Sequence, residues 1–280
     1  GKVRVRDNGR GIPLGKNSQG DDTMMMAVSK LNSGGKYDNK AFKKSVGLNG
    51  VGLKAVNALS WKFVVGAYRD GKCRRLEFKQ GKLISDSGIL DNTEDAPRGT
   101  YVEFEPDNTI FENYTFRKDF IEDQLQNYAY LNTGLAIIYN GKKISSRYGL
   151  KDLLDDRMTS DALYPVIHFK NDDMEIALTH ADQNNEEYYS FVNGQNTSLG
   201  GPHQAAFIEA IGKTIKEFFN KNLELADVRN GVVGAIAINI EDPMFESQTK
   251  NKLSSKDMAP GGDSISKTVN DYIASELDKF

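Results

Sequence analysis

The sequence has 280 residues, a formal net charge of −3 and a single cysteine, Cys73. That length suits two ordinary domains, and one cysteine excludes an internal disulfide framework and fits a reducing, cytoplasmic compartment. No apolar run approaches the roughly 20 residues of a membrane span, so no membrane partner is expected. Because the charge is nearly balanced, any contact with nucleic acid must come from a local patch.

The first half of the chain alternates strand-like and helix-like runs, which predicts a mixed α/β layer. The pattern predicts a strand at 2–6, helices at 23–31 and 53–59, and a hairpin of 61–68 with 73–79. We expect that hairpin to turn at Asp70-Gly71. After an acidic loop at 86–98 come a strand at 99–104, a helix at 116–130 and a strand pair within 135–146.

The second half predicts another unit of mixed helices and strands. The polar stretch 151–160 is interpreted as the join, which gives domains of 1–155 and 156–280. Beyond it, strands are predicted at 166–169, 175–179, 188–192 and 231–240, with a helix at 203–220.

The first candidate site is the stretch VRDNGRGIP at residues 5–13. Gly9 and Gly11 directly follow a strand, where glycine permits a positive φ or a close approach of a ligand, and Pro13 stiffens the exit. Asp7, at the strand end, has the chemistry to accept a hydrogen bond from an exocyclic amine such as that of adenine. The alternative is a simple turn, for which Asn-Gly is a frequent dipeptide.

The second candidate site is the glycine-rich entry to a predicted helix, SVGLNGVGLK at residues 45–54. Backbone N–H groups and the positive end of a helix dipole can bind phosphate. The stretch is not a Walker A loop, because Leu53 separates Gly52 from Lys54 and Ala55 follows. The glycine order also differs from the dinucleotide fingerprint. The polar segment upstream, which carries Lys36, is either a lid over an anionic ligand or a solvated loop.

Taken in order, four motifs resemble the ATP-binding domain of the GHKL superfamily, specifically of type II DNA topoisomerase B subunits: DNGRGIP, NSGGKYDN, GLNGVGLKAVNALS and RGT at 98–100. The motifs SFVNG, GGPH, DVRNG and DPMFESQTK, within residues 190–250, resemble that family's transducer domain. The resemblance covers essentially the whole chain. Asn49 stands where many bacterial members have histidine, and the surrounding stretch is more similar to a topoisomerase IV branch, although gyrase stays open.

The resemblance implies an α/β (α+β) fold: a GHKL (Bergerat) ATP-binding α/β sandwich followed by a transducer domain like ribosomal protein S5. It implies that Asp7 binds the adenine amino group, directly and through water, beside Thr100. The implied ATP-binding residues are Asp7, Gly9, Gly11, Lys36, Gly47, Leu48, Asn49, Gly50, Val51, Gly52, Leu53 and Thr100.

Two further groups of residues follow from the resemblance. Arg10, Ile12, Pro13 and Arg75 are expected to line the mouth of the pocket. Gln248 and Lys250 match the catalytic loop of the second domain that reaches the γ-phosphate, where a cation stabilises the transferred phosphoryl group. Without the resemblance, Lys250 would be an ordinary surface lysine.

The implied activity is that of an ATP-hydrolysing type II topoisomerase, in which ATP binding and hydrolysis drive dimer closure and DNA strand passage. The outcome is relaxation, decatenation or supercoiling. The implied cofactors are ATP and Mg²⁺. The implied partners are DNA, an A-type breakage-reunion subunit and a second B subunit. Arg229 and the face formed by Lys213, Lys216 and Lys221 either touch DNA or are simply solvated. His203 is expected to be structural.

One expectation concerns hydrolysis itself. Only six residues precede Asp7, so we expect the family's first helix to be missing, with its general-base glutamate, its Mg²⁺-binding asparagine and the N-terminal arm. No metal ligand is therefore predicted in this chain, and its C-terminal end is expected to be short. Loss of a general base typically costs about 10²–10⁴-fold in rate. The alternative function is therefore a nucleotide- or inhibitor-binding module with little or no hydrolysis.

Overall fold

The computed structural model describes residues 1–30, 50–93, 96–220 and 223–280. The chain divides into two compact units, the first ending at Arg117 and the second continuing from Lys118 to Phe280. Each unit has its own hydrophobic core. No described helix is long and apolar enough to cross a membrane.

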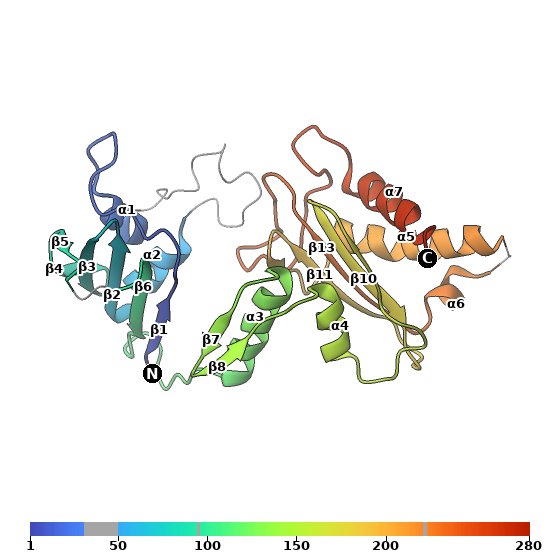
Figure 1. The fold of residues 1–280 in the computed structure, drawn as a ribbon, viewed down its shortest axis with the longest axis horizontal. Coiled ribbons are helices and arrows are strands. Elements are labelled where there is room, and N and C mark those ends of the chain that lie inside the picture. The colour runs from blue at the N-terminus through green and yellow to red at the C-terminus, as the bar shows by residue number, and fades with distance from the viewer. Residues whose placement is uncertain (31–49, 94–95, 221–222) are drawn as a thin grey trace. The chain divides into compact units, whose positions relative to one another are not determined.

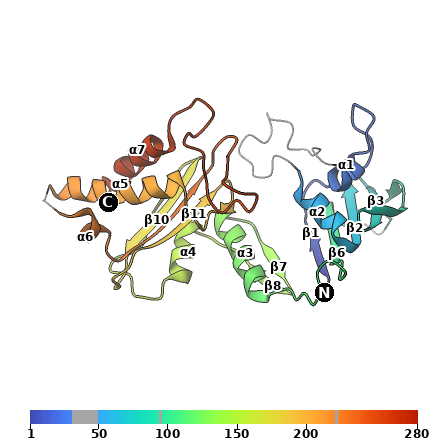
Figure 2. The same cartoon turned by 180° about the vertical axis from the view of Figure 1, so that it is seen from behind.

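The first unit is an antiparallel sheet with helices on one face (Figure 2). Its strand order is β1-β6-β2-β3-β4, and β5 pairs with β3. The strands are β1 (Val3–Arg6), β2 (Ser60–Arg69), β3 (Lys72–Lys79), β4 (Lys82–Asp86), β5 (Leu90–Asp91) and β6 (Gly99–Pro106). The helices α1 (Thr23–Ser29) and α2 (Gly52–Ala58) pack on the face that carries Phe63, Leu76 and Phe104.

The predicted hairpin is confirmed in β2 and β3. Arg69 pairs with Lys72, which leaves Asp70 and Gly71 as a two-residue turn. Both have positive φ, 52° and 71°, as a type I′ turn requires. The Asp-Gly pair therefore sets the register that places each β3 side chain on its face of the sheet.

Strand β1 is held to β6 by a cross-strand charge cluster. Arg4 lies opposite Glu103, and Arg4 Nε donates to Glu103 Oε2 at 2.7 Å. The hydroxyl of Tyr101 donates to the same oxygen at 2.6 Å, and Lys2 lies 3.5 Å from the other. The hydrogen bond from Tyr101 and then that from Arg4 lower the pKa of Glu103 to about 2. The carboxylate thus stays charged and fixes the register of a four-residue edge strand.

The second unit contains a five-stranded sheet of order β12-β11-β13-β10-β9. Its strands are β9 (Ile167–Lys170), β10 (Met174–His180), β11 (Glu187–Val192), β12 (Gln195–Asn196) and β13 (Val232–Ile238). Its helices are α3 (Lys118–Leu131), α4 (Leu150–Arg157), α5 (Pro202–Phe219), α6 (Leu225–Arg229) and α7 (Ile265–Leu277). A separate hairpin joins β7 (Ile137–Tyr139) to β8 (Lys142–Ile144).

This sheet is covered on both faces, as Figure 1 shows, with α5 and α7 on one side and α4 on the other. The central strand β13 accordingly has a continuous apolar sequence, VVGAIAI. Ile176 and Ile236 face α5 and α7, whereas their neighbours Ala177 and Ala235 face α4. The alternation follows the two-residue period of a strand, which sends successive side chains to opposite faces.

The polar join predicted at 151–160 is wrong in its local structure, because most of it is helix α4. Leu150, Leu153 and Leu154 stand at helical spacing and are fully buried against the sheet, while the intervening Lys151 and Asp152 are half-buried. Tyr130 of α3 packs in the same cluster. The compact units accordingly divide at Arg117–Lys118, ahead of the domain boundary predicted at residue 155, which stays a prediction.

Helix α7 was not anticipated from the sequence. Its buried residues Ile265, Val269 and Ile273 recur every four positions, and the side chain of Ser264 caps the helix by accepting from Lys267 N. Both signals were available in the sequence. Both signals lie in a C-terminal segment that is otherwise strongly polar, so its few apolar residues were not recognised as one face of a helix.

Replacement of Leu153 by alanine tests the packing of α4. Because Leu153 is fully buried, we expect Leu153→Ala to lower the free energy of unfolding by about 2–4 kcal/mol. The matched control is Leu163→Ala, at a position 65% exposed, which should change it by less than about 0.5 kcal/mol. Urea denaturation of both variants measures the difference, and equal midpoints would contradict the assignment of α4 to the core.

Candidate functional site

Asp7 lies directly beyond β1, where the first strand leaves the sheet. Its backbone N–H donates to Thr100 O at 3.0 Å, which extends the ladder with β6 by one residue. Its carboxylate oxygen Oδ1 accepts two backbone N–H groups, from Gly9 at 2.8 Å and from Thr100 at 3.0 Å. The side chain is therefore held in one orientation partly by a residue 93 positions away.

Two glycines make this arrangement sterically possible. Gly99 has φ 144°, and a Cβ there would lie 1.9 Å from the carbonyl oxygen of Asp7. Gly11 has φ 74°, and a Cβ there would lie 2.8 Å from the carbonyl oxygen of Tyr68. Any larger residue at either position would push the loop off the strand ends. The two positions thus explain in steric terms why the sequence has glycine there.

The second oxygen of Asp7 is the chemically available atom of this region. Within the part of the chain that the structure describes, no hydrogen bond or ion pair involves Asp7 Oδ2, and the residue is exposed. A carboxylate accepts hydrogen bonds only, so its preferred ligand is an N–H or O–H donor. The turn interpretation and the ligand interpretation of VRDNGRGIP are therefore compatible, since each uses a different oxygen.

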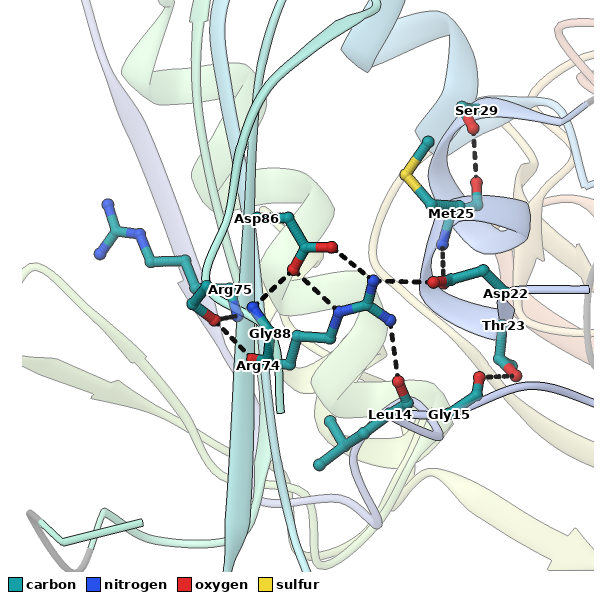
Figure 3. A network of polar contacts seen from close by, with 11 residues as sticks. Leu14, Gly15, Asp22, Thr23, Met25, Ser29, Arg74, Arg75, Asp86 and Gly88 are labelled. Atoms are coloured by element: carbon teal, nitrogen blue, oxygen red, sulfur yellow. Dashed lines mark hydrogen bonds and ion pairs between the residues drawn. The ribbon is translucent and has the colours of Figure 1, made fainter. Parts of the chain in front are cut away.

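The residues expected at the mouth of the pocket lie on two elements of the first unit. Arg10 and Pro13 are exposed, and Ile12 is half-buried against the core beneath α1 and α2. Arg75 is exposed on β3 and points to the opposite side of that strand from Arg74 (Figure 3). The structure thus leaves these four side chains accessible in whole or in part.

The buried guanidinium of Arg74 is the centre of a charge network that anchors the loop after the glycines (Figure 3). It makes a two-point contact with Asp86, Nε to Oδ1 at 3.0 Å and Nη2 to Oδ2 at 2.7 Å. Nη2 also lies 2.7 Å from Asp22 Oδ2, and Nη1 donates to Leu14 O at 2.9 Å. Asp22 caps α1 by accepting from Met25 N. One guanidinium therefore links the loop, the first helix and the edge of the sheet.

The charges of this network stabilise one another. The hydrogen bond from Arg74 lowers the pKa of Asp86, and the pKa of Arg74 is raised in return. For Asp22, burial acts to raise the pKa, but the hydrogen bonds from Arg74 and from Met25 N outweigh it, and the pKa is lowered. All three groups are consequently charged at neutral pH. The network was not anticipated from the sequence. The available signal was Arg74 itself, a charged residue at a position of β3 that the strand alternation directs to the inner face of the sheet.

The glycine-rich helix entry is described only from Gly50 onward. Gly50 has φ 53°, and α2 begins at Gly52. Leu53 packs against the core, and Lys54 is buried, which lowers its pKa. Four residues expected to bind phosphate lie outside the described part of the chain: Lys36, Gly47, Leu48 and Asn49. Their roles stay predictions.

Gln248 and Lys250 lie in a tight turn of the second unit. Lys250 N donates to Ser247 O at 3.0 Å, and Lys250 has a left-handed φ of 58°. Gln248 is exposed and Lys250 is half-buried. The turn closes a hairpin whose arms meet in an antiparallel bridge between Phe245 and Leu253. The side chain of Leu253 is buried in the core of the unit, so the hairpin is fixed at its base.

His203 is structural, as expected from the sequence. It is fully buried near the start of α5, and its Nε2 lies 2.9 Å from Thr197 Oγ1. Burial lowers the pKa of His203 to about 4, so the imidazole is neutral at pH 7. Among the described residues, no group of three or more His, Cys, Asp or Glu side chains is arranged to hold a metal ion.

The comparisons with known proteins agree with this geometry. A family model described as DNA gyrase B matches residues 144–280. The chain is 44% identical to the B subunit of DNA topoisomerase 4 from Borreliella burgdorferi, over 90% of this chain and 40% of that protein. It is 35% identical to the B subunit of DNA gyrase from Helicobacter pylori, over 91% of this chain and 36% of that protein.

Two solved structures extend the match over the whole chain. The 43K ATPase domain of Thermus thermophilus gyrase B, in complex with an aminocoumarin, aligns with a TM-score of 0.74 at 25% identity and covers 100% of this chain and 76% of that one. The topoisomerase IV ATP-binding domain of Francisella tularensis, in complex with a small-molecule inhibitor, aligns with a TM-score of 0.73 at 26% identity, over 100% and 79%.

This chain belongs to the family of type II DNA topoisomerase B subunits. The α/β fold predicted for this family is confirmed, and the first unit has the antiparallel sheet with helices on one face that a GHKL sandwich requires. The chain spans 40% of the length of the first curated relative and 36% of the second. Both topoisomerase IV and gyrase proteins are among the relatives, so that choice is left open.

Removal of the Arg74 guanidinium should destabilise the first unit of this topoisomerase chain. Arg74→Met leaves Asp22 and Asp86 without their shared cation, and we expect a loss of about 3 kcal/mol in the free energy of unfolding. Arg74→Lys should recover only part of it, because an ammonium lacks the two-point geometry. The control is Arg75→Met, at an exposed site, with an effect below about 0.5 kcal/mol. Equal urea midpoints for the Met variants would contradict the anchoring role.

The buried His203 predicts a pH dependence of stability. Its pKa is about 4 in the folded protein and roughly 6.5 when unfolded, so the unfolded state binds more protons between these values. The stabilisation is present above about pH 6.5 and is lost as the pH falls. Between pH 7.5 and pH 5 the wild type should lose about 2 kcal/mol more than His203→Gln, which does not titrate. Urea unfolding at both pH values measures the loss, and parallel losses would disprove it.

Proposed function

We propose that this chain is the ATP-binding region of a type II DNA topoisomerase, and that Asp7 selects adenine. The observation that carries the proposal is the oriented carboxylate of Asp7. Two backbone amides hold Oδ1, while Oδ2 has no hydrogen-bond partner among the described residues. The exocyclic amine of adenine is an N–H donor of the kind that Oδ2 accepts. Guanine presents a carbonyl oxygen at the same place, which the carboxylate would repel.

The proposed roles of the remaining pocket residues follow from the position of Asp7. Gly9 and Gly11 keep side chains away from the base, and Thr100 lies beside Asp7 through the β1–β6 pairing. We assign the phosphates to Lys36 and to the glycine-rich segment 47–53, and the mouth of the pocket to Arg10, Ile12, Pro13 and Arg75. The family membership and the available oxygen of Asp7 support this assignment.

In the second unit, we assign Lys250 and Gln248 to the γ-phosphate. A cation there would stabilise the charge that develops on the transferred phosphoryl group. Among the residues that the structure describes, no group of three or more His, Cys, Asp or Glu side chains is arranged to hold Mg²⁺. We also propose the division into an ATP-binding domain of residues 1–155 and a transducer domain of residues 156–280.

The activity of the whole protein is part of the same proposal. ATP binding would favour dimerisation of B subunits, and hydrolysis would reset the dimer while an A-type partner breaks and rejoins DNA. Contacts that depend on the γ-phosphate couple nucleotide state to conformation, since they exist only before hydrolysis. The names of the curated relatives, which are topoisomerase 4 and gyrase proteins, support this setting.

Replacement of Asp7 by asparagine tests the adenine assignment. The amide oxygen of Asp7→Asn can still accept from Gly9 and Thr100, but its NH₂ group would face the adenine amine, donor against donor. We expect the affinity for ATP to fall about 10- to 100-fold, as for the loss of a charged hydrogen bond. The preference for ATP over GTP should narrow, because an amide N–H suits the guanine carbonyl. Isothermal titration with both nucleotides measures these changes.

The matched control is Asp70→Asn, which removes the same charge from an exposed carboxylate in the β2–β3 turn. Asparagine tolerates the positive φ of that position, so the turn is preserved. This control should bind both nucleotides as the wild type does. Unchanged ATP affinity and base preference in Asp7→Asn would refute the assignment of Asp7 to adenine.

A further inference from the structure

The hairpin of residues 244–255 carries Lys250 at its tip. It is held by contacts within the hairpin and by hydrogen bonds to a neighbouring segment of the chain. Its inner contacts are the bridge between Phe245 and Leu253 and the bond from Glu246 N to Lys252 O at 3.1 Å. These contacts shape the hairpin but do not fix its place on the unit. That place is set by the side chain of Leu253, which is buried in the core of the unit, and by what the Lys250 arm pairs with on its other side.

Residues 199–200 provide that outer partner. Leu199 N donates to Asn251 O at 2.9 Å, and Leu253 N donates to Gly200 O at 3.0 Å. The next residue, Gly201, approaches so closely that a Cβ would lie 2.7 Å from Leu253 O. Asn251 is the immediate neighbour of Lys250. A shift of the 199–200 backbone must therefore move Lys250 or break both hydrogen bonds.

The segment 199–200 is in turn fixed by Thr197, which is buried. Gly200 N donates to Thr197 O at 2.7 Å and closes a tight turn. Thr197 is bound to Ser190 of β11 by its backbone N–H at 2.9 Å and by its hydroxyl at 2.8 Å, both to Ser190 O. The hydroxyl of Ser190 lies 3.0 Å from Thr197 O. Thr197 thus ties the turn to strand β11 of the sheet.

His203 completes this hydroxyl cluster. His203 Nε2 lies 2.9 Å from Thr197 Oγ1. Because the Thr197 hydroxyl has a single proton, donation of that proton to Ser190 O assigns His203 the tautomer whose Nε2–H donates to Thr197 Oγ1. The other ring nitrogen, Nδ1, is buried and has no partner among the described residues. A buried polar atom without a partner costs about 1–3 kcal/mol. An apolar side chain would avoid that cost, which indicates that the donor to Thr197 is what the position needs.

We infer that Thr197 and His203 are positioning residues for Lys250. They act through the backbone of residues 199–200 and fix the position of the Lys250 arm on the second unit. The inference rests on the proposed function for the role of Lys250, but the mechanical link between the cluster and the hairpin stands on the hydrogen bonds alone. The two parts are accordingly tested by different measurements.

Hydrogen exchange of the full chain tests the mechanical link. Thr197→Val keeps the shape but removes the hydroxyl, and Thr197→Ser keeps the hydroxyl. We expect the Leu199 and Leu253 amides to exchange about tenfold faster in Thr197→Val, with near wild-type rates in Thr197→Ser. The amides of β10 and β13 should not change. His203→Leu should behave as Thr197→Val does, whereas His203→Gln keeps a donor and should behave as the wild type.

Two outcomes of this experiment would overturn the inference. The first is a folded Thr197→Val protein whose Leu253 amide exchanges at the wild-type rate. The second is an equal acceleration of exchange at Leu253 and throughout β13, because that would show a general loss of stability rather than a link to the hairpin.

Nucleotide discrimination tests the consequence for the site. The readout is the ratio of the dissociation constant for ADP to that for a β,γ-imido analogue of ATP. Lys250→Ala should lower this ratio, and Thr197→Val should lower it to within about threefold of that value, while Thr197→Ser keeps it. A lowered ratio in Lys250→Ala with a wild-type ratio in Thr197→Val would overturn the inference. A wild-type ratio in Lys250→Ala would instead refute the γ-phosphate role of the proposed function, and hydrogen exchange would then decide the link by itself.

Discussion

The candidate nucleotide site depends on the close approach of the backbone at Asp7 and Gly99. There the carbonyl oxygen of Asp7 occupies the space that a Cβ of Gly99 would need. The approach brings β1 beside β6 and presents Thr100 N to the Asp7 carboxylate. Without it, Asp7 would be one more flexible acid in a glycine-rich loop. With it, one oxygen is fixed and the other stays available to a ligand.

Charge pairs on either side of this contact keep it in register. Glu103 accepts from Arg4 and Tyr101 on the β1 side, and Arg74 binds Asp86, Asp22 and Leu14 O on the side of the outgoing loop. Glu103 and Arg74 are themselves shielded from water, and each is matched by a partner of opposite charge. In the second unit neutral groups have the corresponding role. The Ser190–Thr197–His203 cluster provides hydrogen-bond partners for the buried hydroxyl of Thr197 and thereby positions the hairpin.

Much of the fold was accessible from the sequence because its signals are local. The Asp70-Gly71 turn, the amphipathic pattern of α1 and the apolar run of β13 each depend on a few neighbouring residues. The failures were also local in origin. The leucines of α4 stand among charged residues, and the apolar stripe of α7 is narrow. In both segments the many polar residues made the helical spacing of the apolar residues difficult to recognise. The family motifs indicated Asp7 and Lys250, whereas Arg74 and Thr197 carry no motif.

By itself, the sequence determined which chemical groups this chain offers to a nucleotide: a carboxylate beside glycines, a glycine-rich helix entry and a Gln-Thr-Lys loop. It determined these because residue types and short spacings are written directly in the chain. Only the tertiary structure decided that Asp7 shares its carboxylate with Thr100, and that Lys250 is positioned by residues around position 200. Those relations join segments about 50 to 90 residues apart. Such pairings are set by packing and by the pairing of distant backbone segments, for which a linear sequence contains no direct signal.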